Sequence, residues 1–317
     1  MTYAQFGTVQ ATDFNTLVGG NPTTTANTLN ATWATGGSSA GYGQTAVANV
    51  SAGQSVAATS QWASLVTNTA NAATHQGSSI TAVSTPVAGG TITFLSAIPT
   101  NLQTIYTNRL NAASQGSTSA NTVTTASTWS SIATWTHTAT FANGDAARYF
   151  FNSGGQLKIT MSHPAGTGIN LLLNNLASNV GTIVQSAPAS GSITVSGVSY
   201  NGITKIGGGG NAPTISQNSG YYAMTTANAN VFYQTASTGP AGYLGTNINV
   251  FIKSNGTQGS NSDAGSVITI YTVWDEIPNG LAVSSGSAVT VTAQAPETTN
   301  LANSWGTITL AGSVTVS

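Results

Sequence analysis

The near absence of charge constrains this chain more than any other feature of its sequence. Lys, Arg, Asp and Glu make up 3% of the 317 residues, whereas an ordinary globular chain carries about 25%. The chain is nevertheless 40% hydrophobic with a net charge of -1, unlike disordered chains, which combine low hydrophobicity with high net charge. Its surface must therefore be solvated by neutral hydroxyl and amide groups. Because the abundant Thr is β-branched and favours strands, the sequence predicts a folded, mainly β protein.

The same composition excludes several classes of function. Nucleic-acid binding requires clustered Lys and Arg, and the five basic residues here are too few for a basic patch. The sequence has no run of about twenty apolar residues, and its first six residues do not resemble a secretory signal. We therefore expect no nucleic-acid partner and no membrane insertion. The absence of Cys excludes disulfides, thiolate metal sites and cysteine nucleophiles.

The pattern of apolar and turn residues changes near residue 121. Residues 1–121 contain only two charged residues, Asp13 and Arg109, and read as a mixed part with short helices. A Ser-, Gly- and Thr-rich stretch at residues 114–125 is predicted to be a linker. We therefore predict a docking and oligomerisation domain over residues 1–121 and a second domain over 122–317. The elements expected in the first domain are helices over residues 11–18, 25–34, 55–75 and 101–113 and a strand over 91–95.

Residues 122–317 read as short strands separated by turns. Many short strands at regular spacing predict an antiparallel β-sandwich, jelly-roll-like in type. One segment, residues 169–177, has helical spacing instead and is predicted to cross over the sheet as a helix. The expected strands are residues 147–151, 156–162, 181–185, 192–198, 221–232, 247–253, 267–274, 288–294 and 306–316.

Two pairs of charged residues are candidates for chemistry. Asp145 and Arg148 could grip a ligand, but a role in orienting a turn is favoured. Asp275 and Glu276 are adjacent at a strand end, whereas a glycosidase needs two acids that face one cleft. Since neighbours on a strand point to opposite faces, a solvated strand end is the favoured interpretation.

The remaining candidates are isolated motifs. His75, His137 and His163 have no His or acidic neighbour at metal-ligand spacing. Residues 37–41 match the Gly-x-Ser-x-Gly elbow formally, but no strand and helix pattern flanks them. The glycine run over residues 207–210 lacks the Lys and Ser or Thr of a phosphate loop. We therefore predict no catalytic, cofactor-binding or metal-binding residues, and no enzymatic activity.

Several segments carry a resemblance to a known family. The longest is Ala-Arg-Tyr-Phe-Phe-Asn-Ser-Gly-Gly-Gln-Leu at residues 147–157, and the others are residues 8–17, 29–33, 41–44, 57–65, 75–77 and 108–110. Together they resemble tailed-bacteriophage virion structural proteins of the tail or tail-fibre type, including those of cyanophages. The matches cover about the first 160 residues, and the rest is similar only in texture. The resemblance implies a virion location and a non-enzymatic role.

Three functions remain open on this basis. The first is a tail, neck or baseplate fibre or appendage, and the second is a capsid cement or decoration protein. The third is a host-glycan-binding or depolymerising tail protein, which would need two carboxylates from the β half. The acids available there are Asp145, Asp263, Asp275, Glu276 and Glu297.

The predicted partners are other tail, neck or capsid proteins, a host surface glycan in the third case, and further copies of this chain. Self-association is expected through the first 120 residues, with a trimer suggested by analogy with fibres. The reason is that so short a helical part has difficulty burying many large side chains alone. The side chains concerned are Phe6, Phe14, Leu17, Trp33, Tyr42, Trp62, Phe94 and Tyr106.

Overall fold

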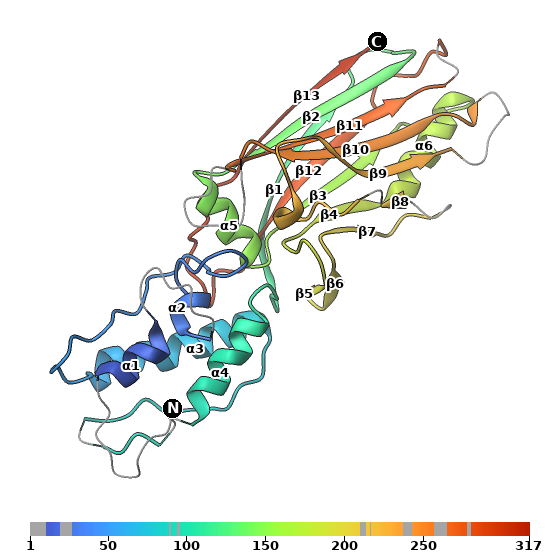
Figure 1. Ribbon diagram of the computed structural model, residues 1–317. Coiled ribbons are helices and arrows are strands. Elements are labelled where there is room, and N and C mark those ends of the chain that lie inside the picture. The colour runs from blue at the N-terminus through green and yellow to red at the C-terminus, as the bar shows by residue number, and fades with distance from the viewer. Residues whose placement is uncertain are drawn as a thin grey trace.

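The computed structural model places a helix-containing part and a two-layered β part end to end (Figure 1). Each part has its own cluster of buried apolar side chains. The structure describes residues 11–19, 27–88, 90–93, 96–209, 214–215, 217–236, 243–256, 265–277 and 280–317.

The helical part confirms the helices expected from apolar spacing. It contains α1 (Ala11–Val18), α2 (Leu29–Thr32), the π-helical turn η1 (Ala58–Trp62), α3 (Ala63–Gln76) and α4 (Ala97–Thr107). The helix α3 ends at Gly77, whose φ of 68° is the left-handed conformation that glycine adopts without strain. Of the strand expected over residues 91–95, residues 91–93 are not in a strand, and 94–95 lie outside the described residues.

The large side chains of the helical part are buried within the chain itself. Five of those expected to need a partner are at most 7% exposed: Phe14, Leu17, Trp33, Tyr42 and Trp62. The rings of Phe14 and Trp62, for example, pack edge to face with centroids 5.0 Å apart. Phe6 and Phe94 lie outside the described residues. Tyr106 is half-buried. For the five buried side chains the prediction that they require an interface is wrong, because they are buried within the helical part itself.

The extended segments of the helical part are held by side-chain amides. In each case an Asn or Gln side chain donates to a backbone carbonyl and accepts from the N–H of the same residue, as a neighbouring strand would. The distances lie between 2.8 and 3.0 Å. The four pairs are Asn15 with Val50, Asn30 with Val47, Asn101 with Thr81, and Gln44 with Ala302. A part with few strands and few charges thereby satisfies its buried backbone.

The β part is an antiparallel β-sandwich, as expected. The first sheet has the order β1-β12-β3-β4-β7 and the second the order β13-β2-β11-β10-β9-β8. A separate hairpin pairs β5 (Ile193–Val195) with β6 (Val198–Tyr200). The strands of the first sheet are β1 (Gln115–Thr124), β12 (Ala288–Pro296), β3 (Gln156–Ser162), β4 (Thr182–Gln185) and β7 (Ile203–Ile206). The strands of the second are β13 (Thr309–Val316), β2 (Ile132–Thr140), β11 (Val267–Asp275), β10 (Asn247–Ser254), β9 (Ala229–Thr235) and β8 (Thr214–Ile215).

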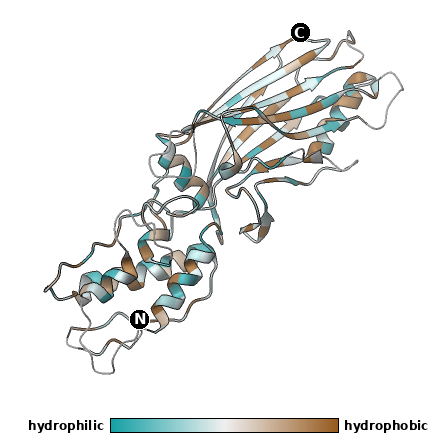
Figure 2. Ribbon diagram, in the orientation of Figure 1, coloured by the Kyte–Doolittle hydropathy of each residue, from teal (hydrophilic) through white to brown (hydrophobic). Residues whose placement is uncertain are grey.

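The core of the sandwich lies between the two sheets. Along β2 and β11 buried and half-buried positions alternate, as expected for strands with one face inward. Figure 2 shows this alternation of hydrophilic and hydrophobic positions along the strands. The rings of Trp135 and Trp274 meet in the core with centroids 5.1 Å apart. The predicted helix is confirmed as α6 (Ile169–Val180), which contacts β3 of one sheet and β9 and β10 of the other.

The connections between strands are of two kinds. The strands β8 to β11 form a meander within the second sheet, whereas β11 to β12 and β12 to β13 cross between the sheets. Crossings of this kind are the jelly-roll-like feature of the fold.

Other predicted elements also differ from the structure. The strand expected at residues 192–198 is the strand β5 and the turn that leads into β6. The proposed linker at residues 114–125 is the strand β1, whose Thr118–Thr124 segment pairs regularly with β12. The strand expected at residues 147–151 is the helix α5 (Gly144–Asn152), because the Asn143 side chain caps its first turn by accepting from the N–H of Ala146 at 2.8 Å. Within residues 221–232 a 3₁₀ turn, η2 (Tyr221–Ala223), precedes β9.

Candidate functional site

The polar residues of the helical part and the sandwich converge at the junction between the two. There α5 lies against a loop over residues 35–43, which we call the junction loop (Figure 1). Arg148 of α5 is fully buried and donates from Nη1 to the carbonyl oxygens of Thr35 and Ala40, each at 2.8 Å. Its Nε and Nη2 donate to Oδ1 of Asp145 at 3.2 and 2.9 Å. The Asp145–Arg148 pair therefore joins chain segments, and its guanidinium is enclosed rather than open to a ligand.

The junction loop is bound from a second side by Arg109. The guanidinium Nε of Arg109 donates to the carbonyl oxygen of Ser39 at 2.6 Å, and its Nη2 donates to the Ser39 hydroxyl at 2.8 Å. The amide of Asn152 donates to the carbonyl of Gly41 at 3.0 Å, and the Tyr222 hydroxyl donates to that of Ser38 at 2.9 Å. The Gly-x-Ser-x-Gly motif at residues 37–41 is thus part of the junction loop, where the central hydroxyl accepts from an arginine instead of facing a histidine base.

Two glycines allow close contacts of the junction loop, Gly41 within the loop itself and Gly43 against α5. Gly41 has a φ of +97°, and a Cβ there would lie 2.1 Å from the carbonyl oxygen of Thr35. Gly43 has a φ of +70°, and its Cβ would lie 2.4 Å from the ring of Tyr149. Burial and the neighbouring Asp145 carboxyl raise the pKa of the Tyr149 hydroxyl. Only glycine fits both positions without displacing backbone or ring atoms.

A second polar link returns the end of the sandwich to the helical part. Nδ1 of His75 on α3 lies 2.9 Å from Oε1 of Glu297, and both residues are buried. The same carboxylate accepts from the backbone N–H groups of Thr299 and Asn300. The His75 side chain, together with these donors and the Asn300 side chain, lowers the pKa of Glu297 to about 2. Four residues further on, Leu301 is buried in the hydrophobic cluster of the helical part.

The other acids of the β half that the structure describes have separate surroundings. Asp275 is half-buried at the end of β11, and Glu276 is fully buried with Oε2 accepting from the N–H of Leu281 at 3.3 Å. The expectation of a solvated strand end is therefore wrong for Glu276. Asp145 and Glu297 are engaged by a basic partner each, and Asp263 lies outside the described residues.

The other two histidines are buried apart from each other in the sandwich. Neither ring nitrogen of His137 has a hydrogen-bond partner among the described residues, and burial lowers its pKa to about 4. His163 is bonded to the Ser287 hydroxyl at 2.8 Å and to Oδ1 of Asn170 at 3.0 Å, and burial lowers its pKa. Within the described part of the chain, no three His, Asp or Glu residues are grouped so that they could hold a metal ion.

The described glycines after β7 lie close to the backbone at the end of α6. A Cβ at Gly208 would lie 2.3 Å from the carbonyl oxygen of Asn179, at the end of α6. Gly210 lies outside the described residues. The described part of this run packs against the neighbouring helix end, and β7 before it is an antiparallel edge strand rather than the parallel strand of a phosphate loop.

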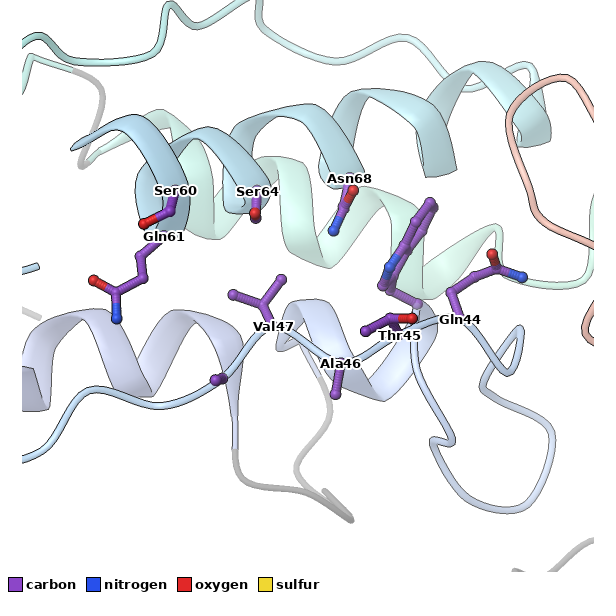
Figure 3. Close-up of a pocket in the computed structure, with 10 residues that line it drawn as sticks. Gln44, Thr45, Ala46, Val47, Ser60, Gln61, Ser64 and Asn68 are labelled. Carbon is purple, nitrogen blue, oxygen red and sulfur yellow. The ribbon is translucent and has the colours of Figure 1, made fainter. Parts of the chain in front are cut away.

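A groove of about 420 Å³ lies in the helical part, between α3 and an extended segment over residues 44–48 (Figure 3). Ser60, Ser64 and Asn68 point into it at four-residue spacing along one face of η1 and α3, opposite Thr45 and Val47. Its lining contains hydroxyl, amide and apolar groups but no titratable side chain. The groove can bind a neutral group by hydrogen bonds, and its lining offers no acid or base for proton transfer. The Ser-Ser-Asn spacing is present in the sequence, but it does not by itself indicate a groove.

Among the described helices, none has the length and apolar character needed to cross a membrane. Comparison of the chain with protein-family models, with curated proteins and with solved structures gives no match.

Proposed function

We propose that this chain is a non-enzymatic structural component of a tailed-bacteriophage virion, in a tail, neck or baseplate fibre or appendage. One observation carries the proposal: the segments that resemble virion proteins contribute many of the residues that hold the molecule together. Arg109, Arg148 and Asn152 bind the junction loop, and His75 and Gln44 bind the returning segment near the end of the chain. The similar residues thus have a common structural role, which is the expected role of a motif in a structural protein.

The surface chemistry also favours a structural component. With a net charge of -1 and 3% charged residues, the chain has little self-repulsion to oppose the close packing of copies. Interactions that do not depend on exposed charges are also little affected by salt. The end-to-end arrangement of the two parts suits an appendage, because one end can dock while the other is exposed (Figure 1).

The positions of the titratable groups favour a non-enzymatic role over a depolymerase. Asp145 and Glu297 are engaged in links between chain segments, and Glu276 is enclosed. The groove in the helical part is lined by neutral groups. A glycosidase that uses two carboxylates would need them on opposite sides of one sugar-binding cleft.

The proposal is tested on particles of the phage that encodes the chain. Mass spectrometry of gradient-purified particles, followed by immunogold labelling with antibodies against the chain, should place it on the tail, neck or baseplate. Labelling distributed over the capsid at high copy number would support the cement or decoration alternative instead. Absence of the chain from intact particles would refute both. Cleavage of host polysaccharide by the purified protein would support the enzymatic alternative.

A further inference from the structure

The two sheets of the sandwich each have a long free edge on the same side. The strand β1 has 10 residues and β13 has 8. Among the described residues each is paired along one side only, β1 with β12 and β13 with β2. The two edges lie next to each other, because a Cβ at Gly312 of β13 would be 2.7 Å from both Asn121 Oδ1 and Val123 Cγ2 of β1. The backbone N–H and C=O groups on the outer edges of β1 and β13 therefore lie along one side of the sandwich, where another strand could bind them.

The opposite side of the sandwich is protected in ways that are usual for proteins. Its edge strands are β7, with 4 residues and the charged Lys205, and β8, with 2 residues. Short edge strands and Lys on an edge both prevent pairing with another chain. The strands β1 and β13 contain no Lys, Arg, Asp, Glu or Pro. The one irregularity in the pairing of β1 lies at its start, between Gln115 and Thr118.

The side chains along this free edge are small and exposed. Residues 116–120 of β1 and 311–313 of β13 are Gly, Ser, Thr and Ala, and all are exposed. Two carbonyls of β1 already accept side-chain donors: that of Gly116 from Gln294 at 2.7 Å, and that of Val123 from Trp135 at 2.9 Å. The stretch over residues 117–122 lies between them. Another strand can approach this stretch closely, because its own side chains are short and uncharged.

We propose that the β1–β13 edge pairs with the same edge of a second copy of this chain, so that the sheets continue from one copy to the next. A second copy fits because a two-fold interface brings a surface against itself, and an edge without charge does not repel its own copy. On the outer face of this sheet, the hydroxyls of Thr122 and Thr290 form a hydrogen bond of 2.8 Å. Cross-strand contacts of this kind can also form between β1 and a strand added to its edge.

This interface rests on the proposed function and deepens it, since it names the surface through which copies of a virion component associate. It also places self-association in the sandwich rather than in the first 120 residues, where five of the large side chains expected at an interface are buried within the chain.

The test introduces charge on both edges of the full-length chain. The variant Ala120→Lys, Ser313→Lys places one Lys on each edge strand. The matched control, Thr160→Lys, Ser199→Lys, adds the same charge at exposed positions of the inner strand β3 and of the β5–β6 hairpin. Sedimentation velocity should show dimers or larger assemblies of the wild type and of the control at about 100 µM, and a dissociation constant at least about tenfold higher for the edge variant.

Hydrogen exchange supplies a second readout that does not depend on the variants. The amides of residues 117–122 and 311–313 should exchange more slowly in the wild type as its concentration rises. A wild type that stays monomeric at about 100 µM, or an edge variant that associates as strongly as the control, would overturn the interface. Detection of a monomeric chain in intact particles would leave the proposed function standing without this interface, whereas an assembling chain absent from particles would do the reverse.

Discussion

Replacing Arg148 with Met should loosen the helical part from the sandwich. The substitution keeps most of the side-chain volume and removes the guanidinium that joins α5 to the junction loop. Arg148 is fully buried, and its hydrogen bonds include two to Asp145 and one each to the carbonyls of Thr35 and Ala40. Without it, the carbonyls of Thr35 and Ala40 and the Asp145 carboxylate lose the hydrogen bonds that the guanidinium donates.

The expected loss in the free energy of unfolding follows from these contacts. Removing one partner of a buried ion pair costs about 3–5 kcal/mol, because the other partner is left uncompensated. The Asp145 side chain is 27% exposed and can regain water, which favours the lower end, about 3 kcal/mol. Arg109→Met is the matched control, since Arg109 binds the same loop but is half-buried and has only neutral partners. Its loss should be about 1–2 kcal/mol.

Urea unfolding of both variants, followed by tryptophan fluorescence, measures the difference. Limited proteolysis with a broad-specificity protease should in addition cut residues 35–43 faster in Arg148→Met than in the wild type. A loss below about 1 kcal/mol for Arg148→Met, or equal losses for the two variants, would refute the reasoning that this buried guanidinium holds the junction.

Three further predictions concern single side chains. Gly43→Ala should lower the free energy of unfolding by about 1–3 kcal/mol, because Gly43 has a φ of +70° and the added Cβ would lie 2.4 Å from the Tyr149 ring. The control Gly53→Ala has a φ of +83° but no atom within 4 Å of the added Cβ, so thermal melting should show a smaller loss of stability. Glu297→Gln should lose about 1–2 kcal/mol at pH 7, after allowance for solvent screening. Because the folded-state pKa of Glu297 is lowered from 4.5 to about 2, this advantage of the wild type should disappear as the pH falls through that window, and a constant difference between pH 7 and pH 3 would contradict it. The His137 pKa is lowered to about 4 in the folded protein, so between pH 6.5 and about 4 the unfolded chain binds a proton that the folded wild type does not, and the wild type loses stability. His137→Leu should remove this loss, so that its urea midpoint changes less than that of the wild type between pH 8 and pH 4.5.

Local patterns in the sequence were sufficient to predict those helices and strands in which the period of the apolar residues matches the pattern of burial. The strands β3, β10, β11 and β12 and the helix α6 lie where alternation or helical spacing places them. The strand predicted at residues 147–151 was wrong, because Ala-Arg-Tyr-Phe-Phe is compatible with a strand as well as with a helix. A helix forms there because Asn143 caps it and because Phe150 and Phe151 then face the core together. The edge strand β1 could not be recognised, because an exposed strand has no hydrophobic alternation to reveal it.

The candidate site depended on contacts that no local pattern contains. Arg148 and Thr35 are 113 positions apart, and His75 and Glu297 are 222 apart. The sequence showed these residues as isolated charges and imidazoles, and only folding gave each a partner. The groove in the helical part likewise needs two segments whose separate patterns do not reveal their contact.

By itself the sequence determined the composition of the surface, the mainly β class and the neutrality that lets copies of the chain approach one another. Those properties are sums over residues or short-range periodicities, so they do not depend on which segments meet. The tertiary structure alone decided that Phe14, Trp33, Tyr42 and Trp62 are buried within the helical part, and that the junction loop is held between Arg109 and Arg148. It also decided that the two long edge strands without charged residues, β1 and β13, lie next to each other. Burial and pairing between distant segments arise only when the whole chain packs, because each buried surface is completed by residues far away in the sequence.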